Sequence, residues 1–163
     1  DDYNSVAVYK NVVYVNTYSH GVFAFNASNA SQIWHATPGG TYSGTNDPPA
    51  IADGIVYVAG IGFDGNLYAL KATTGALIYA TDPGSGGAAI TQSPPSVANG
   101  VVYVGCRSGV CAFNARTGKL LRAFGTPGGR QSPPAIVNGV VYATCGANAA
   151  CAYGLPAERP ASR

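Results

Sequence analysis

One apolar motif occurs four times along the chain, and this repetition constrains the fold more than any other feature. Each copy centres on a tyrosine within a run such as "GVVYVG", and successive tyrosines are separated by 43, 46 and 39 residues: Tyr14, Tyr57, Tyr103 and Tyr142. A period of this length indicates repeated supersecondary units that bury their faces against one another. We expect units at about residues 5–37, 48–81, 94–124 and 133–155, followed by a tail at 156–163.

Within a unit, the pattern predicts four short antiparallel strands. Asn99-Gly100 lies between two β-branched runs, and Asp53-Gly54 and Asn138-Gly139 repeat this signal for a tight hairpin. A third strand follows a small loop, and Thr74-Gly75 or Thr117-Gly118 turns the chain into a fourth. Helical periodicity is absent. Four strands cannot bury both faces alone, so the pattern predicts an all-β protein whose units stack around an axis as the blades of a β-propeller.

The strand count differs in the last unit. The fourth unit continues after "ACAYGL" into "PAERPASR", where two prolines and three charged residues disfavour another central strand. We therefore expect fifteen strands rather than sixteen. An incomplete blade leaves unpaired backbone groups, and a half-ring leaves apolar faces uncovered, so we expect this chain to assemble with another.

The repeat resembles that of a known family. The series Pro-Pro, apolar strand, Asn/Asp-Gly, "VVYVG", "LYAL" and "A-x-T-G-K-L-L" is similar to the quinoprotein-type repeat of pyrroloquinoline quinone (PQQ) dehydrogenases and of BamB-type outer-membrane assembly lipoproteins, over about residues 5–155. The resemblance implies rings of seven or eight blades, so four units would be half a ring or a self-assembling four-blade unit. It implies a fold more than an activity, because many proteins with this repeat bind no quinone. The family's terminal tryptophan is present as Trp34 and replaced by Tyr79 and Arg122.

The four cysteines occupy two equivalent positions of the repeat. Cys106 and Cys145 share a position in the second strand, and Cys111 and Cys151 share one in the third. These positions face each other across a hairpin, which predicts the disulfides Cys106–Cys111 and Cys145–Cys151. A zinc site is the alternative, but C-x4-C and C-x5-C on separate units without a nearby histidine are poor ligand geometry. Disulfides indicate an oxidising compartment.

Other features also favour export. Only 10% of residues are charged, and "FNASNAS" contains two consecutive glycosylation sequons, at Asn26 and Asn29, which also suit a polar turn. The longest apolar runs are of strand length, so no transmembrane segment is predicted. The sequence has no methionine, so we expect a processed chain or part of a longer product. The predicted location is secreted or extracellular, with a periplasmic or cell-surface site as a variant.

The sequence offers no catalytic, cofactor-binding or metal-binding constellation. The two histidines, His20 and His35, are predicted to lie in loops and support no triad, and Asp64 suits a tight turn. The PQQ dehydrogenases that the repeat resembles use an adjacent-cysteine disulfide, a pocket tryptophan and acidic calcium ligands, none of which is recognisable. We expect a non-catalytic module without a cofactor, and the alternative is a fragment of a PQQ-dependent dehydrogenase.

Charge is distributed unevenly along the chain. Residues 1–82 carry six aspartates and two lysines, giving −4, whereas residues 83–163 carry seven Lys/Arg and one glutamate, giving +6. This balance does not suit a nucleic-acid surface, and it favours head-to-tail protein contact, as a closed dimer or a filament. We expect partner contacts from the inter-unit loops at 36–49, 82–95 and 125–134 and from the basic residues Arg107, Arg116, Lys119, Arg122 and Arg130. The expected partner is either the remaining blades of a longer parent or a copy of the chain.

Overall fold

A computed structural model describes residues 5–38, 47–60, 65–81, 90, 93–124, 133–144 and 149–154. Within these ranges the chain is all-β, with fifteen strands in four antiparallel sheets, so the predicted fold class is confirmed. The tail after residue 154, where the sequence disfavours a sixteenth strand, lies outside the described residues. Blade 1 contains β1 (Ser5–Tyr9), β2 (Val12–Asn16), β3 (Val22–Asn26) and β4 (Gln32–Ala36). Blade 2 contains β5 (Ala50–Ala52), β6 (Ile55–Ala59), β7 (Leu67–Lys71) and β8 (Leu77–Ala80). Blade 3 contains β9 (Ser96–Ala98), β10 (Val101–Cys106), β11 (Gly109–Asn114) and β12 (Leu120–Phe124), and blade 4 contains β13 (Ala135–Val137), β14 (Val140–Thr144) and β15 (Ala150–Gly154).

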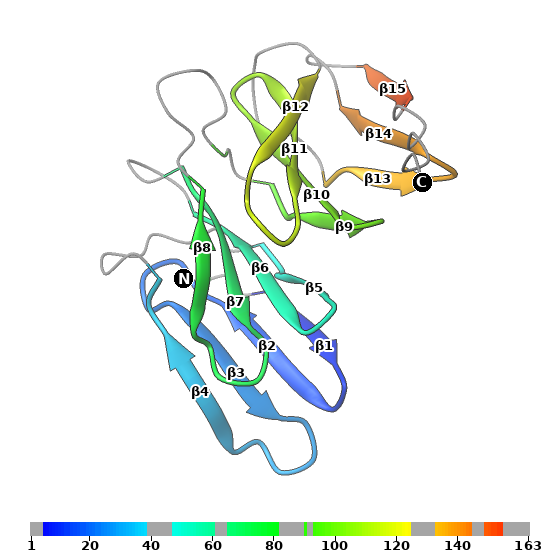
Figure 1. Ribbon diagram of the computed structural model, residues 1–163. Helices are drawn as coiled ribbons and strands as arrows, with labels where there is room; N and C mark the ends of the chain where they lie inside the picture. The colour runs from blue at the N-terminus through cyan, green and yellow to red at the C-terminus, as the bar shows by residue number, and fades with distance from the viewer. Residues whose placement is uncertain are drawn as a thin grey trace, which may run out of the picture.

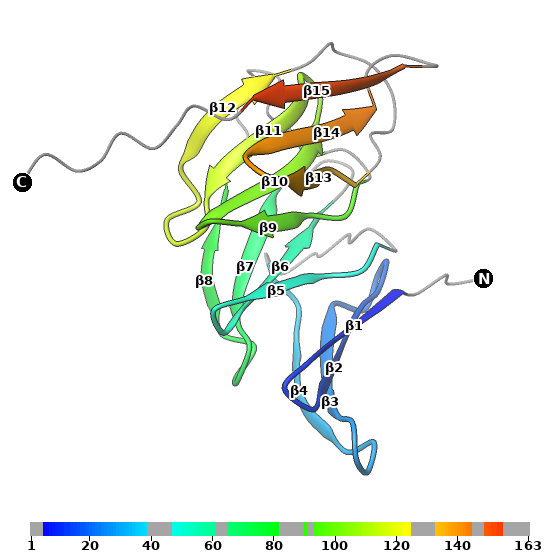
Figure 2. The same ribbon diagram turned by 90° about the vertical axis from the view of Figure 1, so that its right-hand side faces the viewer.

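The blades follow one another in an arc, with blade 1 and blade 4 at its two ends (Figures 1 and 2). In each blade the strands pair in chain order, from an inner strand to an outer one. The inner strands β1, β5, β9 and β13 contact one another in sequence, whereas β4, β8 and β12 form the outer edges of their sheets. The arrangement is that of an open part of a propeller.

The first hairpin of every blade uses the same tight turn. Asp53 and Gly54 have φ of 50° and 76°, and Asn99-Gly100 and Asn138-Gly139 adopt the same conformation. Two successive positive φ angles define the type I′ turn, which confirms the hairpins predicted from these dipeptides. In blade 1 the turn is made by Lys10 and Asn11, at φ of 46° and 62°, although this pair is a weak sequence signal.

Each sheet has two faces, which we call forward and rear. The forward face carries a cross-strand row of a small residue, a tyrosine and an alanine: Ala7, Tyr14 and Ala24 in blade 1, and Ala50, Tyr57 and Ala69 in blade 2. The rear face carries larger apolar side chains from the two middle strands, which in blade 2 are Val56, Val58, Tyr68 and Leu70. Alternation along the strands therefore gives every blade two different apolar faces.

The hydrophobic core consists of three joints, in each of which the forward face of one blade packs on the rear face of the next. Tyr14 and Ala24 of blade 1 form one cluster with the four rear-face residues of blade 2. Tyr57 and Ala69 of blade 2 pack in the same way with Val102 and Phe113 of blade 3. In the third joint, Tyr103 and Ala112 of blade 3 pack with Val141 and Ala143 of blade 4.

Hydrogen bonds across the first two joints fix how the blades are aligned. The Tyr14 hydroxyl donates to the carbonyl of Ala72 at 3.2 Å, and the Trp34 indole Nε1 donates to the same oxygen at 2.8 Å. In the next joint the hydroxyls of Tyr57 and Tyr79 both donate to the carbonyl of Ala115, at 3.1 and 3.0 Å. Each of these carbonyls belongs to the first residue of the turn between the third and fourth strands of its blade. In each joint, one aromatic residue from the second strand and one from the fourth strand of the preceding blade donate to the same carbonyl.

A glycine in that turn makes room for the outer aromatic ring. A Cβ built on Gly75 would lie 2.6 Å from a ring carbon of Trp34, and one built on Gly118 would lie 2.5 Å from a ring carbon of Tyr79. Both glycines also have positive φ, at 70° and 69°. The Thr-Gly dipeptides are therefore docking positions for the preceding blade as well as turns.

This arrangement predicts unequal effects from two similar substitutions in blade 2. Gly54→Ala meets nothing within 4 Å and carries only the cost of positive φ, about 1 kcal/mol. Gly75→Ala has nearly the same φ and must also displace the buried Trp34 ring, which adds roughly 1–3 kcal/mol. Urea unfolding of both variants measures the difference, and equal losses of stability would show that the ring does not dock on Gly75.

Candidate binding surface

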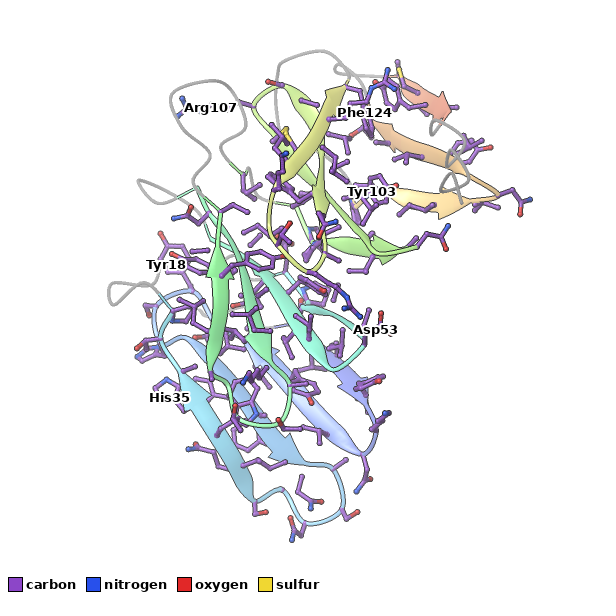
Figure 3. The ribbon with its side chains drawn as sticks, in the orientation of Figure 1. Tyr18, His35, Asp53, Tyr103, Arg107 and Phe124 are labelled. Atoms are coloured by element: carbon purple, nitrogen blue, oxygen red, sulfur yellow. A yellow bond between two sulfur atoms is a disulfide. The ribbon has the colours of Figure 1, made fainter. Side chains whose placement is uncertain are left out.

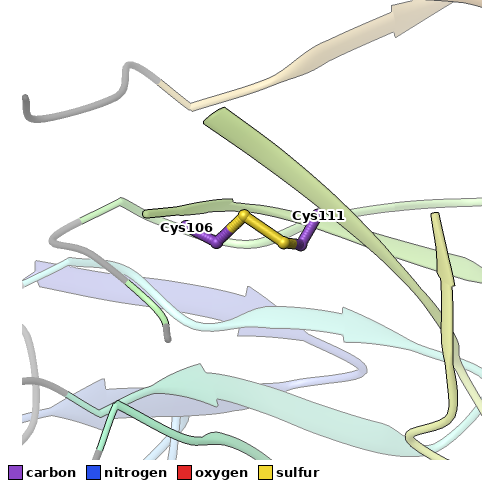
Figure 4. Close-up of a disulfide and its surroundings, with 2 residues drawn as sticks. All are labelled: Cys106 and Cys111. Carbon is purple, nitrogen blue, oxygen red and sulfur yellow. A yellow bond between two sulfur atoms is a disulfide. The ribbon is translucent and has the colours of Figure 1, made fainter. Parts of the chain in front are cut away.

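The predicted bridge between Cys106 and Cys111 is present, and it spans the hairpin diagonally. The sulfurs are bonded at 2.08 Å and the Cα atoms lie 5.8 Å apart (Figure 4). In the register of β10 and β11, Cys106 lies opposite Gly109, and Cys111 lies opposite Val104. The two cysteines are therefore diagonal neighbours rather than a directly opposed pair, a separation that still suits a disulfide.

This disulfide is part of a joint. Cys106 and Cys111 are buried in the cluster that joins blades 2 and 3, beside Val104 and Phe113. In blade 1 the position of Cys106 is held by Thr17, whose hydroxyl donates to the carbonyl of Gly21 at 2.8 Å and so closes the same hairpin. The bridge therefore replaces a local hydrogen bond with a covalent one in an apolar setting.

The second predicted bridge, Cys145–Cys151, involves a residue outside the described ranges. Cys151, on β15, is disulfide-bonded. Cys145 lies outside the described residues, so this pairing stays a prediction.

Burial in the joints perturbs the tyrosines. Removal from water raises the pKa of Tyr14, Tyr57 and Tyr103. At Tyr57 the nearby Asp53 raises the pKa further, and Arg116 opposes this effect. Arg116 is thus close enough to Tyr57 to affect its pKa, and its predicted partner contact stays a prediction.

The two ends of the arc expose faces that are buried everywhere else. The forward-face tyrosines Tyr14, Tyr57 and Tyr103 are at most 2% exposed, whereas Tyr142 of blade 4 is 46% exposed. On the rear face of blade 1, Val6 and Val8 are exposed and Phe23 and Phe25 are half-buried. We call these two surfaces the forward end face and the rear end face.

The end faces keep the composition of a joint. Blade 4 retains the row Ala135, Tyr142 and Ala152, which matches the rows of the other forward faces. Blade 1 has Val13, Val15, Phe23 and Phe25 at the positions that hold Val56, Val58, Tyr68 and Leu70 in blade 2. The same residues can be found by aligning the four repeats in the sequence. Assigning each residue to the forward or the rear face, however, required the strand pairings of the structure.

The predicted basic contact residues are split between sites. Arg107 is exposed in the turn between β10 and β11, at one end of blade 3 (Figure 3). Arg116 and Lys119 are exposed near the turn between β11 and β12, at the opposite end, because successive hairpin turns alternate. Arg122 is exposed on β12, 5.8 Å from the ring centre of Phe124. The described cations therefore do not form one patch. The described residues do not include Arg130 or most of the predicted contact loops at 36–49, 82–95 and 125–134.

The third joint differs from the first two at its outer edge. Arg122 occupies the position of Trp34 and Tyr79, and it is exposed. Two residues later, Phe124 contacts Tyr153 of blade 4 with ring centres 4.9 Å apart. An aromatic pair therefore covers the outer edge where the docking ring is missing.

The sequon asparagines hold the turn between β3 and β4. The Asn26 Oδ1 accepts from the Ser28 amide at 2.8 Å, and the Asn29 Oδ1 accepts from the Ser31 amide at 3.0 Å. Asn29 is exposed and Asn26 is half-buried. These bonds suit a polar turn, and glycosylation stays a prediction.

The two histidines lie close together. His20 is in the turn after β2, as expected, but the expectation of a loop is wrong for His35, which belongs to β4. Its ring stacks on Phe23 with centroids 4.2 Å apart, and its Nε2 lies 2.5 Å from the His20 carbonyl. The His35 ring is accommodated in a strand because it stacks on the Phe23 ring of the neighbouring strand.

Comparison with known proteins agrees with this geometry. A family model described as outer membrane protein assembly factor BamB matches residues 4–158. The chain therefore belongs to that family, and its fold is a β-propeller of PQQ-like repeats. No curated protein sequence matches the chain closely enough to count as a relative.

Solved structures share the fold at low sequence identity. BamB from Moraxella catarrhalis superposes on 93% of this chain with a TM-score of 0.71 and 18% identity, and the match covers 46% of that protein. The computationally designed Ika4 protein gives a TM-score of 0.76 at 16% identity over 93% of this chain and 89% of its own. Quinohemoprotein alcohol dehydrogenase from Comamonas testosteroni gives 0.58 at 26% identity over 71% of this chain and 20% of its own. The chain thus spans about half the length of BamB.

The described residues do not fit a quinone site. The only tryptophan, Trp34, is engaged with Ala72 and Gly75 in a joint. Cys106 and Cys111 are separated along the chain by the β10–β11 turn and are buried. Within the described ranges, no group of three or more His, Cys, Asp or Glu is placed to hold a metal ion. In the same part of the chain, no helix has the length and hydropathy needed to cross a membrane.

The disulfide makes a testable contribution to stability. Replacing both cysteines by alanine, Cys106→Ala with Cys111→Ala, should lower the free energy of unfolding by about 2 kcal/mol, because a short loop is released in the unfolded chain. Non-reducing peptide mapping should first show Cys106 joined to Cys111. Urea unfolding then gives the loss, and a double variant as stable as the parent protein would contradict the assignment.

Proposed function

We propose that this chain is a non-catalytic, exported propeller module with a structural or protein-binding role. The observation that supports this most is the pair of end faces, which carry joint-forming apolar rows but remain open to solvent. Apolar faces of this kind favour docking against further blades. Protein–protein contact through these faces is therefore the proposed mechanism.

Export is the second part of the proposal. A buried disulfide suits an oxidising compartment, and Asn29 presents a sequon on an exposed turn. The family description concerns outer-membrane assembly, so a periplasmic or cell-surface location is compatible with the proposal.

A fragment of a PQQ-dependent dehydrogenase is the second candidate, since such an enzyme shares the fold. Against it, the chain's tryptophan and its described disulfide are used between blades. A dehydrogenase fragment would need its quinone and calcium groups to come from elsewhere.

Thermal unfolding with PQQ and calcium tests the choice between these candidates. The melting temperature should stay unchanged, and no dye-linked alcohol oxidation should appear, because the described residues do not build the site. Stabilisation that saturates with PQQ concentration would support the dehydrogenase and contradict a non-catalytic role.

A further inference from the structure

We propose that the two end faces pair with each other between two copies of this chain, so that blade 4 of each copy docks on blade 1 of the other. The result is a closed ring of two chains and eight blades. This inference rests on the proposed function, in which the end faces are docking surfaces, and it names their partner.

The forward end face has the row that forms the other joints. Ala135, Tyr142 and Ala152 are in cross-strand register, as Ala7, Tyr14 and Ala24 are in blade 1. Ala24 is fully buried by the following blade, whereas Ala152 is exposed. The described part of blade 4 therefore presents a joint surface without a blade in front of it.

The rear end face has the complementary surface. Val8 has the same register position as Ile51, Val97 and Ile136, each of which packs into a joint cluster beside a forward-face tyrosine. These three residues are half-buried, but Val8 is 66% exposed. A second copy's blade 4 would cover Val8 in the way that blade 1 covers Ile51.

Blade 1 also has a carbonyl equivalent to those that accept the tyrosine hydroxyls in the first two joints. The amide of Ala27 donates to the Asn11 carbonyl, as those of Ala72 and Ala115 donate to the Gly54 and Gly100 carbonyls, so Ala27 is their equivalent in blade 1. Ala72 and Ala115 accept from Tyr14 and Tyr57. By the same geometry, the Tyr142 hydroxyl of one copy donates to the Ala27 carbonyl of the other.

The outer edge of the joint between copies differs from the first two joints, in which Trp34 or Tyr79 docks on the next blade. Ala30 occupies the position of Gly75 and Gly118, with φ of 58°, and its amide makes the equivalent turn hydrogen bond. At Gly75 and Gly118 a Cβ would collide with the docked ring of the preceding blade, so the Cβ of Ala30 does not suit such a ring. In blade 4, no fourth strand that could supply such a ring lies within the described residues. Among the described residues, neither side of the joint supplies the outer contact, so the joint between copies should be weaker than the first two joints within the chain.

Size and charge favour a second copy as the occupant. The chain covers 46% of the BamB chain of Moraxella catarrhalis, so two copies supply about as many blades as that one protein. The charges lie mostly outside the end blades, because Lys10 is the only charged residue among those described in blades 1 and 4. The C-terminal half, at +6, and the N-terminal half, at −4, therefore attract each other only at long range and low ionic strength, and the joint itself stays apolar.

Native mass as a function of concentration is the first test. Light scattering of the purified chain should reach a plateau at twice 16.5 kDa as concentration rises from micromolar to millimolar. A mass that stays at 16.5 kDa, or one that grows past two copies as a filament would, overturns the proposal.

Point variants test the named contacts. Tyr142→Phe removes only the hydroxyl and should weaken each joint roughly threefold to tenfold, the range for one neutral hydrogen bond. Tyr142→Lys should raise the dissociation constant at least about tenfold, because a charge would be buried among apolar side chains. Tyr18→Lys is the matched control, because Tyr18 is also 46% exposed but lies in the turn after β2 (Figure 3). Equal effects at Tyr18 and Tyr142 would contradict the interface.

A mixing experiment tests the pairing of forward with rear. The experiment uses a protein concentration at which the parent chain is paired and Tyr142→Lys is monomeric. Val8→Asp, which alters the rear end face instead of the forward one, should also be monomeric there. A mixed pair keeps one intact joint and places both altered side chains, of opposite charge, in the other. Equal amounts of the two variants should therefore restore the two-chain mass. If the mixture stays monomeric, the faces do not pair in this way, a result independent of the PQQ experiment.

Discussion

The structure depends on the contact between the forward face of one blade and the rear face of the next. A four-stranded antiparallel sheet with two apolar faces cannot remove both from water, so each blade is stable only where neighbours cover it. The middle blades satisfy this requirement on both sides, and their rear-face side chains Val56, Val58, Val102 and Val104 are fully buried. Blades 1 and 4 satisfy it on one side. The open ends and their proposed docking role follow from this one constraint.

Polar contacts give the joints a fixed alignment. Apolar packing tolerates sliding, but a tyrosine hydroxyl that reaches a single carbonyl in the next blade does not. In the first two joints a second aromatic residue reaches the same carbonyl, and a glycine beneath its ring permits the approach. The buried Cys106–Cys111 bridge strengthens the hairpin that one of these joints uses. Trp34, Tyr79, Gly75, Gly118 and the Cys106–Cys111 bridge thus all serve the stacking of blades.

Much of this fold could be predicted from the sequence, because the period, the Asn-Gly and Asp-Gly turns and the cysteine positions are local signals. The fifteen described strands and the Cys106–Cys111 bridge were predictable for the same reason, although the diagonal geometry required the register of β10 and β11. The docking role of Gly75 was not predictable, since a positive φ in a turn explains a glycine without any ring above it. His35 was misplaced in a loop because its contact with Phe23 comes from cross-strand pairing, which composition does not reveal. The exposed Tyr142 looks like the other three tyrosines in sequence, and only burial distinguishes it.

Hydrogen–deuterium exchange followed by mass spectrometry, at several protein concentrations, tests the central claim that covered faces stabilise the blades. The account predicts slow amide exchange in β6, β7, β10 and β11 at every concentration, because both faces of those sheets are covered. In β2, β3, β14 and β15 exchange should be faster in dilute protein and should slow as concentration rises. Equally slow exchange in all four blades, independent of concentration, would contradict the account.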